Sequence, residues 1–355
     1  MMARPPWGAD GEGDPDFPED TPEEDLWFLP GPDPDEDDLP PGASPLPRAS
    51  RTLLFDPQDW RKAQDTLSDE LARLTQVFGE LDVRLRVAGP GARHRLALRE
   101  VTDLSWWAGD RLLMENLALW MALRVGSTED TEQALSRAGW AVRRLSAGPF
   151  PAQRLSEFLE RQDTTAPEDG LDPGRLADLS EVLASVVSLH PVVQAAVLFH
   201  AWRILGVDRS RDIEAAVLAA RHGATMSRLP GQGALFLPLA VTGPTAFRGQ
   251  GQAEDKLRAW VAGAEQACLA ALLHLDRLAD WHREASQRIA DLSGRTPGRL
   301  LSVLEAWPLV SAPLAEAEAR VSRATVQRNF ERLMRRGVVR EITGQGRYRI
   351  WTARM

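Results

Sequence analysis

The sequence predicts a mainly α protein, in which a helical bundle is preceded by a disordered acidic tail and followed by a winged helix-turn-helix. Three observations support this prediction. Apolar residues recur at helical spacing over most of the chain after residue 50. No convincing strand pattern occurs before residue 337, and the last stretch has the order helix, helix, turn, helix and hairpin. We therefore divide the chain into domains at 1–50, 51–294 and 295–355.

The tail is identified by its composition. Residues 1–47 contain 12 of the 25 prolines and 14 of the 51 acidic residues, with one arginine, so their net charge is -13. Such a stretch cannot bury enough apolar surface to offset the entropy lost on ordering. The apolar island Leu26–Leu29 has two open interpretations: local solvated structure, or an anchor that docks on a groove of this chain or of a partner.

Composition also excludes several classes of protein. Hydrophobic residues make up 43% of the chain and charged residues 26%, as in ordinary globular proteins. Cys268 is the one cysteine, so an intrachain disulfide is excluded and a reducing, cytoplasmic location is expected. The acidic N-terminus does not resemble a signal peptide, and no apolar run reaches the ~18 residues of a membrane span. We expect no membrane association.

The middle of the chain predicts helices separated by Gly- and Pro-rich connections. The expected helices cover 57–87, 94–124, 131–144, 191–205 and 253–290, with a break at 89–91 and loops at 162–174 and 229–252. Whether the stretch 94–124 is one helix or is interrupted near Gly109 stays open. The helix at 191–205 is apolar on every side, which is typical of a helix at the centre of a bundle. Cys268 falls on the apolar stripe of the last helix, so we expect it in the core.

The C-terminal segment gives the clearest sequence of elements. A first helix ends at Trp307, and a second runs from the N-cap Ser311 to about Arg320. The third helix is expected over 323–336, with Ser322 as its N-cap and Gly337 ending it. Strands at 338–342 and 347–351, joined by a tight turn, complete a wing.

Residue types in this segment indicate double-stranded DNA as the partner. A recognition helix needs short polar or arginine side chains in its first turns, and phosphate contacts need positive charge. The last 35 residues carry nine arginines and two glutamates, although the net charge of the whole chain is -9. The predicted DNA-contacting residues are Ser322, Arg323, Thr325, Gln327, Arg328, Arg332, Arg335, Arg336, Arg347 and Arg349. The alternative is a protein-binding module with a solvated arginine face.

Two segments carry a resemblance to known proteins. Residues 104–117 and 342–349 resemble bacterial proteins in which domain of unknown function 1612 is followed by a helix-turn-helix domain. This resemblance covers most of residues 50–355 and implies DNA binding at the C-terminal end. In layout, the hydrophobic helix 192–205, the long helix 253–290 and the C-terminal module are also similar to Fic-type adenylyltransferases that end in a winged helix.

The Fic resemblance implies a catalytic loop reading His-Pro-Phe-x-Asp/Glu-Gly-Asn-Gly-Arg, which this chain lacks. After the hydrophobic helix the sequence contains neither that histidine nor Gly-Asn-Gly-Arg. His190 and Pro191 begin a helix instead. Asp208, Arg209 and Arg211 leave two interpretations, an anion site or a solvated helix N-terminus. The six histidines lack metal-ligand spacing, so we expect no metal, no cofactor and no catalytic residue.

The sequence therefore predicts a DNA-binding protein, and more finely a transcriptional regulator. The helical region would serve for dimerisation, giving a homodimer, or for sensing an unknown effector. The alternatives are a divergent or degenerate Fic-like nucleotidyltransferase, and a protein-interaction module whose winged helix does not bind DNA.

The charge asymmetry generates the first prediction. The acidic tail has two open interpretations: it competes with DNA for the same arginines, which a flexible chain spanning roughly 40 Å can reach, or it only keeps the protein soluble. Deleting residues 1–47 should tighten binding to nonspecific duplex DNA several-fold at low salt. The gain should shrink near 0.3 M salt, where the Debye length is roughly 6 Å. Equal affinities of the full-length and truncated proteins at low salt, measured by fluorescence anisotropy, would show that the tail acts only on solubility.

Overall fold

A computed structural model describes residues 55–123, 129–148, 155–159, 172–206, 211–344 and 349–355. The predicted tail lies outside these residues. All described residues belong to one compact unit, which extends from Ser50 to Met355. The predicted boundary between helical and C-terminal domains lies inside this unit and stays a prediction.

The first two helices cover the stretch in which one helix and a break were predicted. Helix α1 (Pro57–Thr66) begins with Pro57 after the N-cap Asp56, and α2 (Ser68–Ala108) follows after Leu67. The prediction of one helix over 57–87 is therefore wrong, because the stretch is divided into two helices at Leu67. The predicted break at 89–91 is a kink inside α2, because Gly89 takes a φ of 84° and the helix resumes at once.

Six more helices follow α2 in the described residues up to residue 223, and the predicted central one, α7, packs against α6 and α8. They are α3 (Met114–Leu123), α4 (Glu129–Ser146), α5 (Leu155–Leu159), α6 (Pro173–Ser185), α7 (Pro191–Ile204) and α8 (Asp212–Gly223). Residues 192–202 of α7 are all buried, which confirms its predicted place in the core. The main partner of α7 is α8, which is buried from Ile213 to Gly223. Two short 3-10 helices, Ala224–Met226 and Thr245–Arg248, lie in the connection that leads to α9.

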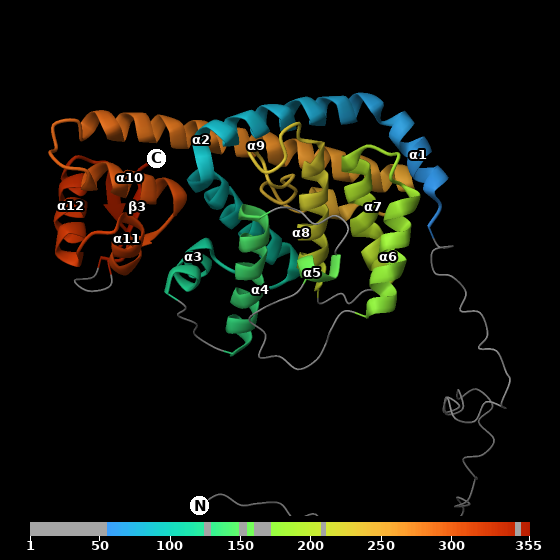
Figure 1. The fold of residues 1–355 in the computed structure, drawn as a ribbon, viewed down its shortest axis with the longest axis horizontal. Helices are drawn as coiled ribbons and strands as arrows, with labels where there is room; N and C mark the ends of the chain where they lie inside the picture. Colours follow the sequence, from blue (N-terminus) through green and yellow to red (C-terminus); the bar gives the residue numbers. More distant parts are fainter. Residues whose placement is uncertain (1–54, 124–128, 149–154, 160–171, 207–210, 345–348) are drawn as a thin grey trace, which may run out of the picture. The chain divides into compact units, whose positions relative to one another are not determined.

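Helix α9 (Ala253–Arg288) is the 36-residue helix predicted from its apolar stripe. It packs beside α2, as Figure 1 shows for the two long helices. The stripe is buried, and Cys268 lies within it with a raised thiol pKa, because burial penalises the thiolate. The core position predicted for Cys268 is thereby confirmed. Among the helices that the structure describes, none is both long and apolar enough to cross a membrane.

The C-terminal segment forms three helices and a small sheet. The elements are α10 (Thr296–Ala306), β1 (Val310–Ser311), α11 (Ala312–Ala319), α12 (Arg323–Arg335), β2 (Val339–Glu341) and β3 (Ile350–Ala353). The strands are antiparallel in the order β1-β3-β2, with Trp351 facing Val310 on one side and Glu341 on the other. The sequence missed β1, because two residues are too few for a strand pattern.

A buried carboxyl fixes the long connection before α9. Glu100 of α2 is fully buried, and its Oε1 accepts hydrogen bonds from the backbone N–H groups of Leu239 (2.8 Å) and Ala240 (2.9 Å). Burial raises the pKa of Glu100 to about 8. The carboxyl group is therefore protonated at neutral pH while it holds the connection against α2.

This raised pKa makes the stability of the fold pH-dependent. Between about pH 5 and pH 8 the folded state keeps a proton that the unfolded state releases, so the free energy of unfolding falls as the pH rises. Glu100→Gln retains a carbonyl acceptor and has no proton to lose. We expect its free energy of unfolding, relative to the wild type, to improve from pH 5 to pH 8 in urea titrations. The exposed Asp59→Asn serves as the control, and identical pH dependence of wild type and Glu100→Gln would contradict the prediction.

Candidate nucleic-acid interface

Helix α12 is held by one apolar side. Val326, Phe330 and Leu333 are buried, and the Phe330 ring stacks on Trp351 of β3 with a centroid distance of 4.3 Å and an angle of 4°. Asn329 is also buried, and its Nδ2 donates to the backbone carbonyl of Thr325 at 2.7 Å, so this polar group is satisfied inside the helix. These contacts determine which side of α12 faces away from the protein.

The opposite side of α12 is exposed and carries most of the predicted contact residues. The exposed ones are Arg323, Gln327, Arg328, Arg332 and Arg335. Thr325 is half-buried at the edge of this side. Ala324 and Glu331 are exposed one turn before and one turn after Arg328. Residue type alone did not select these two, although the helical spacing of the buried residues would have placed them there.

The start of α12 presents two hydroxyl groups. Ser322 occupies the N-cap position, with extended backbone angles, but its side chain makes no capping hydrogen bond. The Ser322 hydroxyl instead lies 2.9 Å from the Thr325 hydroxyl. The predicted cap is therefore wrong in its hydrogen bond, although right in its position. The first backbone N–H groups of α12 lack intrahelical partners, as at any helix N-terminus, which suits a phosphate group.

The turn between α11 and α12 depends on an arginine in an unusual conformation. Arg320 caps α11 with a left-handed backbone, φ 54°, and its N–H bonds to the carbonyl of Glu316. Arg299 of α10 approaches the same turn, with Nη1 donating to the carbonyl of Ala319 at 3.3 Å. Arg320 is exposed, so the turn adds a positive charge next to the start of α12.

The far end of α12 is tied to the helical region. Arg336 binds the Asp291 carboxylate through both terminal nitrogens, with an Nη2–Oδ2 distance of 2.8 Å, and also the Arg288 carbonyl. This pairing lowers the pKa of Asp291 and raises that of Arg336. In the described structure, Arg336 is thus occupied by a carboxylate, unlike the exposed arginines of the predicted set. Gly337 follows with φ 67°, the C′ glycine that the sequence indicated.

Of the two hairpin arginines predicted to contact DNA, the structure describes Arg349. Arg340 is exposed on β2, where it pairs with Thr352 of β3. Arg349 precedes β3, and its Nε lies 3.7 Å from Oε2 of Glu341. Arg347 and the turn at 345–348 lie outside the described residues, so the prediction that Arg347 and Arg349 share one face remains a prediction.

Helices α2 and α9 hold the C-terminal unit through hydrogen bonds to its backbone carbonyls. Trp281 Nε1 donates to the Val338 carbonyl at 3.0 Å, and Arg288 Nη1 donates to the Gly337 carbonyl at 3.1 Å. From α2, the buried Arg95 donates to the carbonyl of Leu304 at 3.0 Å. Burial lowers the pKa of Arg95 to about 10, which still leaves it cationic at neutral pH.

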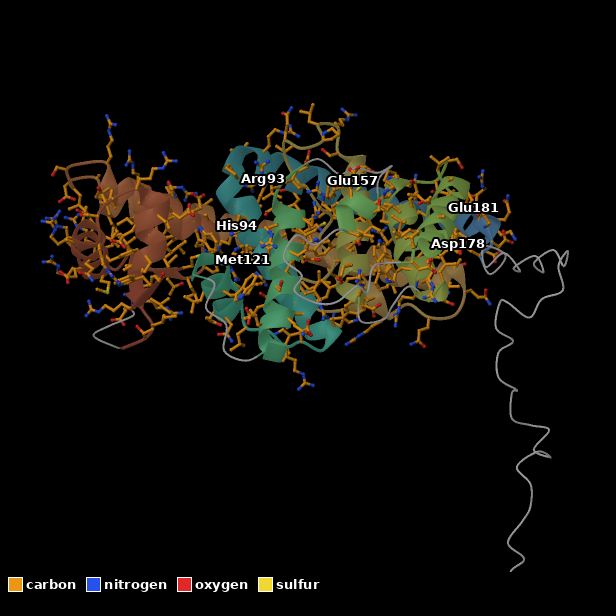
Figure 2. The ribbon with its side chains drawn as sticks, turned by 60° about the horizontal axis from the view of Figure 1, so that its bottom comes forward. Arg93, His94, Met121, Glu157, Asp178 and Glu181 are labelled. Carbon is orange, nitrogen blue, oxygen red and sulfur yellow. The ribbon has the colours of Figure 1, made fainter. Side chains whose placement is uncertain are left out.

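An aromatic contact adds to this attachment. The His94 ring lies 4.5 Å from the Trp307 ring, centroid to centroid. Figure 2 shows His94 and Arg93 projecting from α2 in this part of the molecule. Burial lowers the pKa of His94 to about 4, so the ring is neutral and packs as an aromatic group.

Other sequence candidates have structural roles. His190 is the N-cap of α7, and its Nδ1 accepts from the N–H of Val192 at 3.3 Å, which confirms the predicted helix start. His200 is buried beside the Trp60 and Trp260 rings, and its Nε2 has no hydrogen-bond partner among the described residues. Asp208 and Arg209 lie outside the described residues. Within the described ranges, no group of three or more His, Cys, Asp and Glu side chains could hold a metal.

The comparisons with known proteins agree with the geometry of the C-terminal unit. Residues 298–353 match the family model described as HTH DNA binding domain. No curated protein matches the chain. The matched residues contain ten arginines and five glutamates, a net charge of +5 in a chain of net charge -9. The chain therefore carries a helix-turn-helix DNA-binding domain at its C-terminal end.

The strained turn generates a prediction with a matched pair of variants. A non-glycine residue in the left-handed region costs roughly 1–2 kcal/mol, whereas glycine adopts it without strain but loses more chain entropy on folding. Arg320→Gly should therefore raise the free energy of unfolding by up to about 1 kcal/mol. Arg320→Ala removes the same charge and keeps the strain, so it should not stabilise. Chemical denaturation of both variants tests this, and equal stability would exclude backbone strain as the cause.

Proposed function

We propose that this chain is a sequence-specific regulator of transcription that places α12 in the major groove of duplex DNA. The observation that carries the proposal is the exposed side of α12, where Arg328 lies between Ala324 and Glu331 and opposite the stacked Phe330. The match of residues 298–353 to an HTH DNA binding domain supports the same partner.

Base contacts on this side follow from side-chain chemistry. Arg328 can donate two hydrogen bonds to guanine, and Glu331 can accept one from the amino group of cytosine. The Ala324 methyl group suits contact with a thymine methyl. Arg323 and Arg332 flank this row and would bind phosphates, so they set position more than sequence.

The hairpin formed by β2 and β3 would act as a wing beside the recognition helix. Arg340 is exposed on β2, and Arg349 stands at the start of β3. Both would contribute phosphate contacts, with the ion pair between Arg349 and Glu341 exchanging for a phosphate. Transfer of adenylyl groups forms no part of this proposal, because the sequence lacks the loop that such enzymes use.

The binding experiment uses the full chain and a random-sequence duplex. About five phosphate contacts should give a log–log salt slope of about -4 to -5. On a selected target sequence, Arg328→Ala should weaken binding by ~1–3 kcal/mol. Arg283→Ala removes the same charge from the exposed surface of α9 and should have little effect on either duplex.

Two outcomes would contradict the proposal. Binding that does not depend on salt would exclude the phosphate interface. Equal affinity of the Arg328→Ala variant and the wild type for the selected sequence would exclude α12 as the reading element. For the regulatory role, genome-wide mapping should place the wild type at promoters and the Arg328→Ala variant at far fewer of them.

A further inference from the structure

Four aliphatic side chains are exposed on the two long helices that lie side by side in Figure 1. Val83 and Val87 of α2 are 52% and 84% exposed, and Leu269 and Leu273 of α9 are 50% and 52% exposed. Each pair is spaced by four residues, so its members share one side of their helix. Single exposed aliphatics are ordinary, but paired ones on neighbouring helices indicate a contact surface.

Two ion pairs fix how the helices align. Arg73 lies 3.9 Å from Glu265, and Arg84 lies 2.8 Å from Asp276. In both pairs the residue of α9 lies 192 positions after the residue of α2. The two helices therefore run parallel, and each residue of α2 is level with the residue of α9 that lies 192 positions later. Val83 is therefore level with residue 275, about 3 Å along the helix from the level of Leu273.

We propose that this surface is the interface with a second copy of the chain. We name it the α2–α9 face and define it by Glu80, Val83, Arg84, Val87, Leu269 and Leu273. A two-fold axis perpendicular to both helices, at the level of Leu273, would pair the two copies antiparallel. Residues near such an axis meet their own copies, so Leu273 packs on the partner's Leu273 and Val83 on the partner's Val83.

The charges of the α2–α9 face favour a second copy of the chain as its partner. Glu80 and Arg84 lie on either side of the proposed axis, one helical turn apart. Reversing the helix direction places Glu80 opposite the partner's Arg84, which also keeps its own pair with Asp276, and the converse pair forms by symmetry. The surface is thus complementary to itself in charge as well as apolar at its centre.

The spacing of the DNA-binding units agrees with this arrangement, an argument that rests on the proposed function. Trp281 and Arg288, which hold the C-terminal unit, lie roughly 12 and 22 Å along α9 from the level of Leu273. Two copies of these attachment points would be about 25–45 Å apart along the helices. One turn of B-DNA, the usual distance between half-sites, is about 34–36 Å and lies inside this range.

Sedimentation equilibrium of the full chain, without DNA, tests the interface independently of the proposed function. Between about 1 and 100 µM the wild type should show a monomer–dimer equilibrium. Leu273→Glu brings two carboxylates together at the axis and should raise the dimer dissociation constant at least about ten-fold. Val187→Glu adds the same charge at another exposed aliphatic, 73% exposed after α6, and should leave the constant unchanged.

A cross-linking variant provides a positive signal that does not depend on loss of binding. Leu273→Cys should form a disulfide with the partner's copy under mild oxidation, because residue 273 lies at the level of the axis and its two Cα atoms would lie within about 7 Å. The native Cys268 is buried and does not compete. A monomer throughout the concentration range, a dimer insensitive to Leu273→Glu, or no cross-link in the Leu273→Cys variant would each overturn the proposal.

Discussion

The continuity of α9 is the constraint on which the rest of the structure depends. Its 36 residues form one uninterrupted helix, roughly 54 Å long. Its buried stripe packs on α2 and the 3-10 helix at 245–248, and its last turns hold the C-terminal unit through Trp281 and Arg288. Because a helix resists bending, a displacement of α9 within the core would be transmitted to the base of the DNA-binding unit. The helical region therefore fixes where the C-terminal unit lies.

The arginines of this chain fall into two groups. Some donate hydrogen bonds to backbone carbonyls near the ends of helices, and others are exposed on α12 and give the candidate interface its positive charge. Arg95, Arg288 and Arg299 donate to the carbonyls of Leu304, Gly337 and Ala319, close to where α10, α12 and α11 end. A guanidinium group suits this role, because it supplies several donors and remains charged when partly buried. On the outer side of α12, Arg328 and Arg335 donate through Nε to carbonyls of their own helix, and both side chains are exposed. The net charge of the C-terminal unit therefore does not show which of its arginines are exposed and which hold the fold together.

Much of the fold could be predicted from periodicity, because apolar spacing reports burial directly. The buried helix at 191–204, the stripe containing Cys268 and the glycine after α12 were all recognisable. The sequence could not distinguish a break from a kink at Gly89, since both need the same residues. It also could not separate Arg336, which binds Asp291, from its exposed neighbour Arg335, because the carboxylate partner lies 45 residues away. Local patterns predict elements, whereas ion pairs depend on how those elements meet.

The stacking of Phe330 on Trp351 joins the small sheet to α12. Strand β3 lies between β1 and β2 and so connects the start of α11 with the residues after α12. Trp351 is fully buried and packs against the side of α12 opposite Arg328. The orientation of the exposed side of α12 thus depends on a residue buried behind it. If α12 reads DNA as proposed, its sequence specificity depends on the stacking of Phe330 on Trp351 as well as on the side chains that α12 exposes.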